Sequence, residues 1–349
     1  MKICNIVGTR PQFIKYAMME QEFNGHKNIL VHSGQHYDKV LYQQFFDELL
    51  IRHPDYNIGI GSGNYGWQVG ELVKRLYDII KGVSPDVVLV YGDCNTTYAG
   101  AVATNLCHLP LAHVESGLRC FNWRMIEEFN RVQTDHCSRF CFAPTETAMF
   151  YLEKEGLGEL SYLVGDLHYD SYLYYKDRFA ETDILDKIEV KPDGYYLSTI
   201  HRAETLDDPD KLIGLFDTFN RLKHPVLLVM HPHLKKVLGG VNVDYSNILV
   251  NDAVGYLDMQ RLLKNCRMVL TDSGGLTTEA FFHQKKTMVL REQFEYNDIP
   301  VNMSVLVGTD GQRLYDEINN IDDSKCDDKQ LFGDGNTAEK IMMILEEKL

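Results

Sequence analysis

The chain has 349 residues, of which 44% are hydrophobic and 24% charged, the balance of a globular protein long enough for two domains. Its formal net charge is −15, so its overall field argues against nucleic acid or an anionic membrane as a partner. No apolar run approaches the roughly eighteen residues that a membrane helix needs. Eight scattered cysteines without a C-x-x-C pair favour a reduced, cytoplasmic protein without structural zinc.

Apolar, β-rich runs alternate with helical patterns through the first half of the chain. We expect strands at 3–7, 28–32, 86–91, 111–114, 141–143 and 161–164, and helices at 12–23, 43–50, 67–82, 97–107 and 127–140. The run DVVLVY (86–91) is apolar almost throughout, which is typical of a parallel strand covered on both faces. This half therefore predicts a doubly wound parallel sheet.

A second, similar series occupies the rest of the chain. We expect strands at 195–199, 226–231, 248–250, 268–271 and 287–290, helices at 209–222, 258–265 and 276–283, and an amphipathic helix at 337–349. The charged, less patterned stretch 169–193 is interpreted as the linker region. Two βα series of similar length predict an α/β protein with two doubly wound, Rossmann-like domains, 1–168 and 169–336, facing each other across a cleft.

Polar residues follow four of the expected strands. They are Arg10 and Lys15 after the first, Asp93 after DVVLVY, Glu115 after LAHV, and His201 with Arg202 after YYLST. Ligands of open α/β sheets lie beyond the carboxyl ends of the strands. A single aspartate at such a position is more often a helix cap, as Asp93 could be. Four polar strand ends together favour a functional site.

The segment LTDSGGLTTEAFF (270–282) has the composition of an anion site. Ser273, Gly274 and Gly275 separate an apolar strand from a helix, and glycines let backbone N–H groups approach a phosphate at the positive helix end. Glu279, about one turn into the helix, could accept hydrogen bonds from a sugar hydroxyl. An ordinary glycine-containing βα loop is the alternative.

Two further motifs are weaker. GSGNYG (61–66) fits a dinucleotide fingerprint, but the run before it is a poor buried strand, so a nicotinamide site is not expected. His231 and His233 in MHPH lack a clear third ligand, so no metal is expected either.

The helix expected after Glu127 carries a polar stripe. Residues spaced at i, i+3, i+4 and i+7 share one face, here Glu127, Asn130, Arg131 and Thr134. We expect the apolar residues to pack inward, namely Ile126, Phe129, Cys137 and Phe140. A solvated polar face is the usual outcome for such a stripe, but the nearby Asp93 and Glu115 favour a functional one.

Taken together, the motifs resemble those of the UDP-N-acetylglucosamine 2-epimerase family. They occur in order and nearly end to end: GTRPQFIK (8–15), SGQHYD (33–38), YGDCNTT (91–97), HVESGLR (113–119), EEFNR (127–131), TIHRAE (199–204), LTDSGG (270–275) and VGTD (307–310). The resemblance implies the GT-B fold, with the helix 337–349 packing back on the first domain, and a homodimer.

The resemblance also implies a reaction without metal or cofactor, in which UDP is eliminated across C1–C2 to a 2-acetamidoglucal and then added back. Transferred by motif, the catalytic residues are Lys15, Asp93, Glu115, Glu127 and His201. Residues that bind the UDP-sugar would be Arg10, Arg131, His231, Ser273, Gly274, Gly275 and Glu279. In the non-hydrolysing branch a second UDP-sugar can act as an activator, and residues resembling that site are Gln35, His36, Gln68 and Arg202.

Several alternatives stay open at this point. The chain could be a hydrolysing 2-epimerase, an epimerase of a modified UDP-sugar (a 2,3-diacetamido uronate or a 6-deoxy sugar), a GT-B glycosyltransferase or a non-catalytic sensor. Three acidic candidates in the first half argue against the last two. The family's usual proline before the glutamate pair is Ile126 here, and EQFEY (292–296) leaves Glu295 as an incomplete match.

Overall fold

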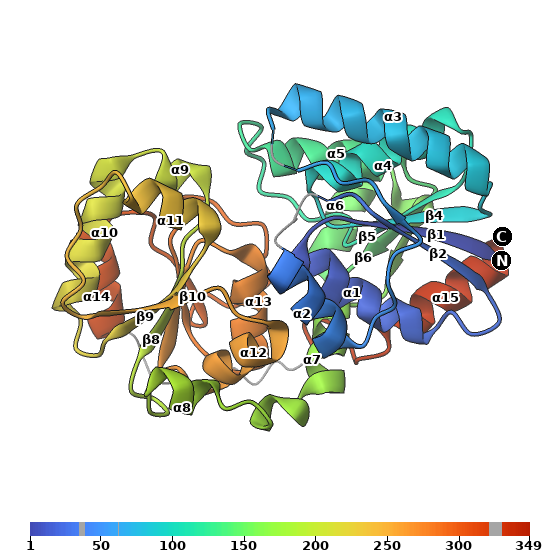
Figure 1. Cartoon of the computed structure of the whole chain (residues 1–349). Helices are drawn as coiled ribbons and strands as arrows, with labels where there is room; N and C mark the ends of the chain where they lie inside the picture. The colour runs from blue at the N-terminus through green and yellow to red at the C-terminus, as the bar shows by residue number, and fades with distance from the viewer. Residues whose placement is uncertain (35–38, 62, 321–329) are drawn as a thin grey trace. The chain divides into compact units, whose positions relative to one another are not determined.

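The computed structural model of the chain describes residues 1–34, 39–61, 63–320 and 330–349 (Figure 1). Its internal contacts define two compact units. Unit 1 comprises Met1–Tyr174 and Gln330–Leu349, and unit 2 comprises Tyr175–Lys329. The domains expected from the sequence, 1–168 with 337–349 and 169–336, differ from these units by a few residues at each junction.

Unit 1 is built on a seven-stranded parallel sheet. The strand order is β3 (Tyr56–Asn57), β2 (Lys27–His32), β1 (Lys2–Val7), β4 (Val87–Tyr91), β5 (Leu111–Val114), β6 (Phe140–Ala143) and β7 (Ser161–Leu163). All five residues of β4 are fully buried, as expected for a central strand covered on both faces. The order reverses between β1 and β4, the switch point at which such sheets leave room for a ligand.

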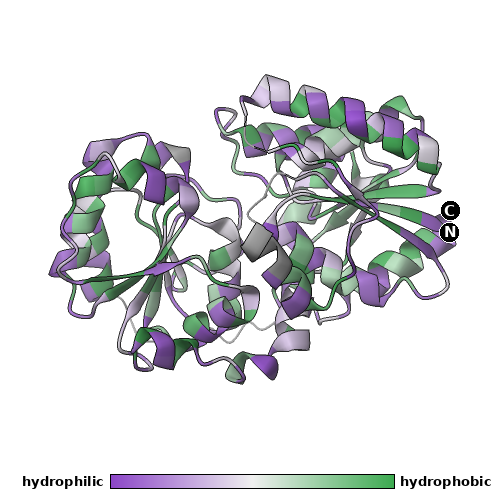
Figure 2. Cartoon of the chain, in the orientation of Figure 1, coloured by the Kyte–Doolittle hydropathy of each residue, from purple (hydrophilic) through white to green (hydrophobic). Residues whose placement is uncertain are grey.

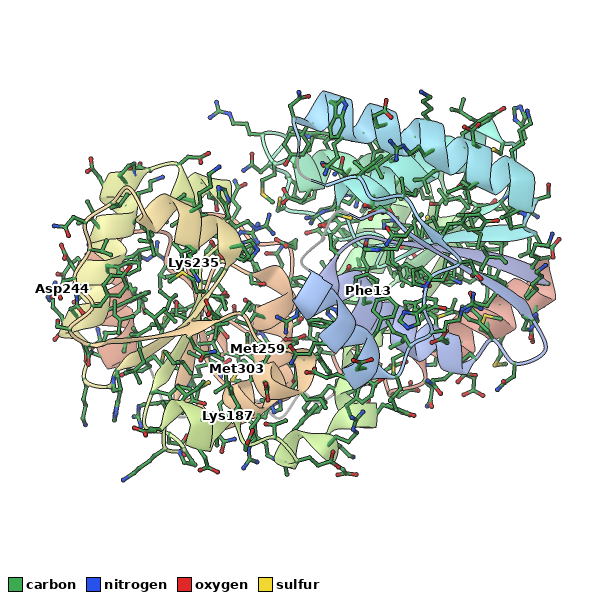
Figure 3. The ribbon with its side chains drawn as sticks, viewed as in Figure 1. Phe13, Lys187, Lys235, Asp244, Met259 and Met303 are labelled. Carbon is green, nitrogen blue, oxygen red and sulfur yellow. The ribbon has the colours of Figure 1, made fainter. Side chains whose placement is uncertain are left out.

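Helices cover the sheet of unit 1. They are α1 (Arg10–Gln21), α2 (Lys39–Leu49), α3 (Tyr65–Val83), α4 (Asn95–Leu106), α5 (Ile126–Cys137), α6 (Glu146–Lys154), α7 (Leu167–Tyr175) and the C-terminal α15 (Thr337–Lys348). Phe13 of α1 packs edge-on against Phe46 of α2, with ring centroids 5.2 Å apart (Figure 3). Hydrophobic residues dominate the strands and polar residues the outer helix faces (Figure 2).

Unit 2 has a six-stranded parallel sheet of its own. The strand order is β10 (Ile248–Asp252), β9 (Val226–Met230), β8 (Tyr196–Thr199), β11 (Met268–Thr271), β12 (Thr287–Val289) and β13 (Ser304–Leu306). Its helices are α8 (Ile184–Ile188), α9 (Ala203–Leu206), α10 (Pro209–Arg221), α11 (Pro232–Leu238), α12 (Tyr256–Asn265), α13 (Gly274–Phe282) and α14 (Gly311–Asn320). Met259 and Met303 are buried, whereas Lys187, Lys235 and Asp244 are exposed (Figure 3).

The segment 169–193, interpreted from the sequence as the linker region, includes the boundary between the two units at Tyr174 and Tyr175 and is largely helical. It contains most of α7, the short 3-10 helix Arg178–Ala180 and α8. Phe179, Ile184 and Leu185 are buried, so a few apolar anchors fix the segment although charged residues surround them. Among the described residues, no helix has the length and apolar character that crossing a membrane demands.

Candidate active site

Lys15 and Glu115 form a buried ion pair at the carboxyl edge of the sheet of unit 1. Lys15 lies on α1, after β1, and its ammonium group contacts the carboxylate of Glu115, which follows β5. Burial alone lowers the pKa of Lys15, but the charges of Glu115, Asp166 and Asp93 together outweigh it, so the pKa ends above its usual value. Lys15 is therefore a permanent cation at neutral pH.

Asp93, directly after β4, is tied to helix α5. Its Oδ2 accepts a hydrogen bond from Nη2 of Arg131 at 2.7 Å, and its backbone carbonyl accepts one from Nδ2 of Asn130 at 3.0 Å. The N-cap of α4 is Cys94, so Asp93 does not occupy the capping position that the sequence left as an alternative. The carboxylate is instead held beside the guanidinium of Arg131, and about one third of the Asp93 side chain is exposed.

The polar face of α5 is the buried one. Glu128, Asn130, Arg131, Thr134 and Asp135 are all at most 2% exposed, whereas Phe129 is 36% exposed. The prediction that the apolar residues of this helix pack inward is therefore wrong for Phe129, and Ile126 and Cys137 are only half-buried. Phe140 is buried, but in strand β6. The polar face turns inward because its side chains contact charged groups at the strand ends.

The two adjacent glutamates at the start of α5 have different surroundings. The Glu128 carboxylate accepts hydrogen bonds from the backbone N–H groups of Cys120, at 3.1 Å, and Phe121, at 2.7 Å. Glu128 thus secures the preceding loop, while Glu127 is half-buried in the first turn. Ile126 occupies the first helical position, where proline is favoured but not required, so the missing proline does not displace the start of the helix.

A strained turn presents Glu115. Its φ is +75°, which is rare for a residue other than glycine. The N–H groups of Glu115 and Ser116 both donate to the carbonyl of Phe142, at 3.1 and 3.0 Å. A Cβ added to Gly92 would lie 3.1 Å from Oε2 of Glu115, so the Glu115 carboxylate lies against the residue that precedes Asp93. The structure therefore gathers the predicted residues Lys15, Asp93, Glu115 and Arg131 at adjacent strand ends.

Other predicted residues of unit 1 have contacts of their own. The guanidinium of Arg10 stacks over the ring of Phe45, 4.8 Å from its centroid. Nε2 of Gln68 donates to the carbonyl of Gly61 and its Oε1 accepts from Asn95, which anchors α3 to α4. Gln35 and His36 lie outside the described residues.

In unit 2, Asp272 is the acid that holds His201. Its Oδ1 lies 2.9 Å from Nδ1 of His201, and its carboxylate accepts the N–H groups of His201 and Arg202 at 2.9 and 2.8 Å. Burial favours the neutral acid, but His201 and these N–H groups outweigh it and lower the pKa of Asp272. The rings of His201 and His231 lie 5.5 Å apart. Sequence reasoning missed Asp272, although an acid directly before Ser-Gly-Gly was a usable signal.

The glycine-rich turn of unit 2 opens helix α13. Ser273 is the N-cap, and its hydroxyl accepts from the N–H of Leu276; Gly275 is the second helical residue and Glu279 is buried further along. A Cβ on Gly274 would come within 2.7 Å of Oε1 of Glu295, so a larger residue there would have to displace the Glu295 carboxylate. Glu295 is itself buried and paired with Arg291 at 2.8 Å. The predicted anion loop therefore lies at the N-terminus of α13, with Gly274 and Gly275 as its first two helical residues.

Metal ligands are not clustered in the described part of the chain. No group of three or more histidine, cysteine, aspartate or glutamate side chains could hold an ion there. His231 instead caps α11 by accepting the N–H of His233 at 3.2 Å.

The chain is similar in sequence to proteins of one known family. The sequence model of the family described as UDP-N-acetylglucosamine 2-epimerase matches residues 20–346. A UDP-N-acetylglucosamine 2-epimerase homolog of Methanococcus maripaludis is 39% identical, with 99% of each chain covered. UDP-2,3-diacetamido-2,3-dideoxy-D-glucuronate 2-epimerase of Pseudomonas aeruginosa is 38% identical, with 98% of each covered.

Solved structures show the same fold. The crystal structure of Methanocaldococcus jannaschii UDP-GlcNAc 2-epimerase in complex with UDP-GlcNAc and UDP superposes with a TM-score of 0.94 at 34% identity, covering 99% of this chain and all of that one. The Rickettsia bellii enzyme gives a TM-score of 0.89 at 30% identity, covering this whole chain and 96% of that one. The predicted GT-B architecture of two Rossmann-like domains is confirmed, and by motif, sequence and structure the chain is a member of the UDP-N-acetylglucosamine 2-epimerase family.

Proposed function

We propose that the chain inverts C2 of a UDP-2-acetamido sugar by eliminating and re-adding UDP, without net hydrolysis. The family's enzymes are UDP-sugar 2-epimerases, which are isomerases. The observation that carries the mechanism is the pair of acids at the ends of β4 and β5. Asp93 lies beside Arg131 and Glu115 beside Lys15, so two carboxyl groups are fixed at neighbouring strand ends.

The chemistry needs acids and bases on both faces of one carbon. One carboxylate takes the C2 proton while the C1–oxygen bond breaks, which releases UDP and leaves a 2-acetamidoglucal. A second group, protonated at the start, then gives its proton to C2 on the opposite face as UDP re-forms the bond to C1. One proton leaves the sugar and one enters it, so atoms and charge balance. Asp93, Glu115 and Glu127 are the proposed acid and base groups. Lys15, which contacts the Glu115 carboxyl group, and Arg10 offer positive charge to the departing phosphate.

Unit 2 supplies the proposed nucleotide contacts. The N–H groups at Ser273–Gly275 would receive the diphosphate, and Glu279 the ribose hydroxyls. Asp272 accepts from Nδ1 of His201, which leaves Nε2 as the atom that meets the substrate. His231, whose ring lies 5.5 Å from that of His201, completes the proposed binding set.

The sugar itself belongs to one of two classes. Relatives at 35–36% identity carry the name UDP-N-acetylglucosamine 2-epimerase, and the Pseudomonas relative, at 38%, acts on a 2,3-diacetamido uronate. Both share the UDP and the 2-acetamido group on which the reaction depends. A role in polysaccharide precursor synthesis, a homodimer, a UDP-sugar activator at Gln68 and Arg202, and a cytoplasmic location rest on the resemblance. The seven free cysteines among the described residues fit a reducing compartment.

Proton NMR in deuterated water tests the reaction. With UDP-N-acetylglucosamine, we expect the anomeric signal of the manno epimer to grow while deuterium enters C2. Glu115→Gln should lower kcat by ~100-fold or more and leave UDP binding within about twofold, because Glu115 is not among the proposed UDP contacts, which are Lys15 and Arg10 in unit 1 and the residues of unit 2. Glu153→Gln, an exposed change on α6, is the matched control.

The possible outcomes separate the alternatives. Free N-acetylmannosamine with UDP would make the enzyme a hydrolysing one. No turnover of the plain sugar but turnover of the diacetamido uronate would assign the second substrate class. If Glu115→Gln keeps full turnover, the mechanism proposed for that carboxylate is wrong.

A further inference from the structure

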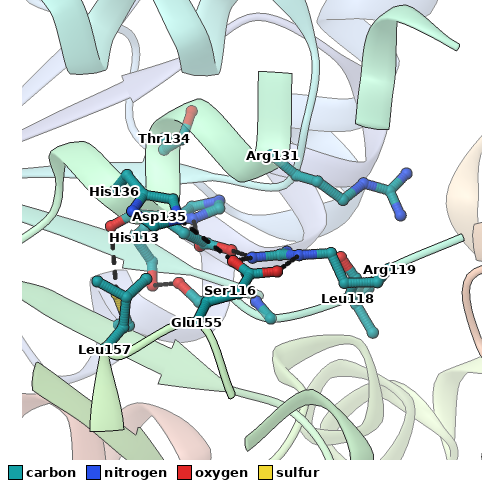
Figure 4. Close-up of polar contacts among 12 residues, drawn as sticks. His113, Ser116, Leu118, Arg119, Arg131, Thr134, Asp135, His136, Glu155 and Leu157 are labelled. Atoms are coloured by element: carbon teal, nitrogen blue, oxygen red, sulfur yellow. Dashed lines mark hydrogen bonds and ion pairs between the residues drawn. The ribbon is translucent and has the colours of Figure 1, made fainter. Parts of the chain in front are cut away.

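A charged cluster, buried except at its outer residue Glu155, lies behind the acids of unit 1. It consists of His113 on β5, Asp135 on α5, Arg119 and Glu155, and Figure 4 shows these side chains joined in one chain of polar contacts. His113 and Asp135 have no exposed side-chain surface, and Arg119 has 1%. No residue of this cluster belongs to the acid–base or UDP-binding set proposed above.

Both ring nitrogens of His113 face hydrogen-bond acceptors. Nδ1 lies 2.6 Å from Oδ1 of Asp135, and Nε2 lies 2.7 Å from the carbonyl oxygen of Gly92. A carbonyl oxygen has no proton to donate. The other carboxylate oxygen of Asp135 is 2.7 Å from the guanidinium of Arg119, which keeps that acid ionised. Since a neutral imidazole has only one N–H, the geometry requires a doubly protonated His113.

The charges around His113 balance only when the ring is protonated. Two cations, His113 and Arg119, then face two anions, Asp135 and Glu155, whose carboxylate binds Arg119 through both oxygens. A neutral imidazole would leave one negative charge in excess in this buried cluster, which is costly. The remaining neighbours are His136, exposed and 3.3 Å from Glu155, and the Cys141 thiol, which contacts the Asp135 carbonyl and whose pKa is raised by burial.

The pair His113–Asp135 touches all the segments that carry the proposed acids. Through the carbonyl of Gly92 it holds the residue before Asp93. Oδ2 of Asp135 accepts the N–H of Gly117 at 3.1 Å, which closes the strained turn that presents Glu115. Asp135 itself lies on α5, about two turns beyond Glu127. One ion pair thus connects β4, the turn after β5, and α5.

We propose that His113, held as an imidazolium between Asp135 and the Gly92 carbonyl, is a positioning residue that fixes Asp93 and Glu115 relative to each other. This inference rests on the proposed function, because those two carboxylates are its acid and base. Misplacing a reacting group by about 1 Å can cost on the order of 100-fold in rate. The histidine acts through the backbone at Gly92 and Gly117 and does not touch the substrate.

The first test compares His113→Gln with His136→Gln, a matched change at the exposed end of the same cluster. We expect His113→Gln to lower kcat by ~10- to 100-fold with KM within about threefold, because the proposed UDP contacts lie elsewhere. His136→Gln should stay within about twofold of the parent. If His113→Gln does not fold, Asp135→Asn replaces it, with the same expected loss. Unchanged kcat, or a loss confined to KM, in the folded variant overturns the positioning role.

The second test reads the protonation state without a variant. In ¹⁵N-histidine-labelled protein, both ring nitrogens of His113 should be bonded to hydrogen under the conditions of the turnover assay, because both face acceptors. A neutral tautomer there overturns the proposal. If the unmodified enzyme turns over neither UDP-sugar class, the proposed function fails and the positioning role fails with it. Turnover together with a neutral His113 refutes only the present inference.

Discussion

We expect Glu127 to be needed for turnover and Glu128 for stability. We expect Glu128→Gln to lower the free energy of unfolding by about 1–3 kcal/mol, because the charged acceptor of the Cys120 and Phe121 N–H groups is lost. Glu127→Gln should leave that free energy within about 0.5 kcal/mol but lower kcat by ~100-fold or more. Chemical denaturation and a turnover assay on both variants measure the two effects.

Glu153→Gln again serves as the control, since its side chain is exposed on α6 and neither property should change. The contrast between the neighbours is what matters. Equal losses of stability in Glu127→Gln and Glu128→Gln would contradict the separate roles. Full turnover in Glu127→Gln would remove that residue from the acid–base set.

The elements of this fold differ in how far the sequence could predict them. Continuous apolar runs such as β4 and β5 are predicted to within one residue, because burial on both faces leaves little choice of side chain. The strands β3 and β13 are not predicted, because their residues are exposed or only half-buried and form no buried apolar run. In helix α5 the apolar residues are expected on the buried face, but the polar stripe occupies that face instead.

The candidate site shows the same limit. Asp93 and Glu115 could be predicted because they directly follow strands, where ligands bind. The residues that hold these two side chains in place could not be predicted. Asp135 and His113 are 22 residues apart in the sequence. The contact between α5 and β5 that brings them together cannot be predicted from local residue spacing. Sequence pattern therefore indicates the residues at strand ends and leaves out those that hold them in place.

The C-terminal helix α15 depends on a cap supplied by another element. Its own N-cap residue, Asn336, makes no side-chain capping bond, and Asp170 of α7 takes over that role. Oδ1 of Asp170 accepts the Thr337 hydroxyl at 2.8 Å and Oδ2 accepts the N–H of Ala338 at 3.1 Å. The cap couples the end of the chain to unit 1.

Removing this cap should loosen α15 before the rest of unit 1. We expect Asp170→Ala to lower stability by about 1–2 kcal/mol and to speed amide exchange in α15 more than in β4. Hydrogen exchange followed by mass spectrometry measures both segments in one sample. Asp177→Ala, a change outside the bonds of this cap, is the control. Equal acceleration in α15 and β4 would mean that the helix has no separate dependence on Asp170.

For the molecule as a whole, stability at acid pH should depend on histidines that are neutral in the folded state. His168 in unit 1 is fully enclosed, and burial, followed by the charge of Lys15, lowers its pKa to about 3. The unfolded chain would titrate near the usual value of about 6.5. Below that pH the unfolded state binds a proton that the folded state does not bind. The stability that this histidine contributes above about pH 6.5 is therefore lost as the pH falls toward 3.

At pH 5 this single group should remove about 2 kcal/mol of unfolding free energy relative to pH 8. His168→Gln cannot take up that proton, so we expect its loss of stability between these two pH values to be smaller by the same amount, whatever the variant costs at pH 8. Unit 1 is followed through the exchange of β4 amides, because unit 2 has a core of its own. His136→Gln, exposed, should keep the parent's pH dependence. An identical acid response in His168→Gln would show that this histidine accepts its proton in the folded state, and the buried neutral form would be wrong.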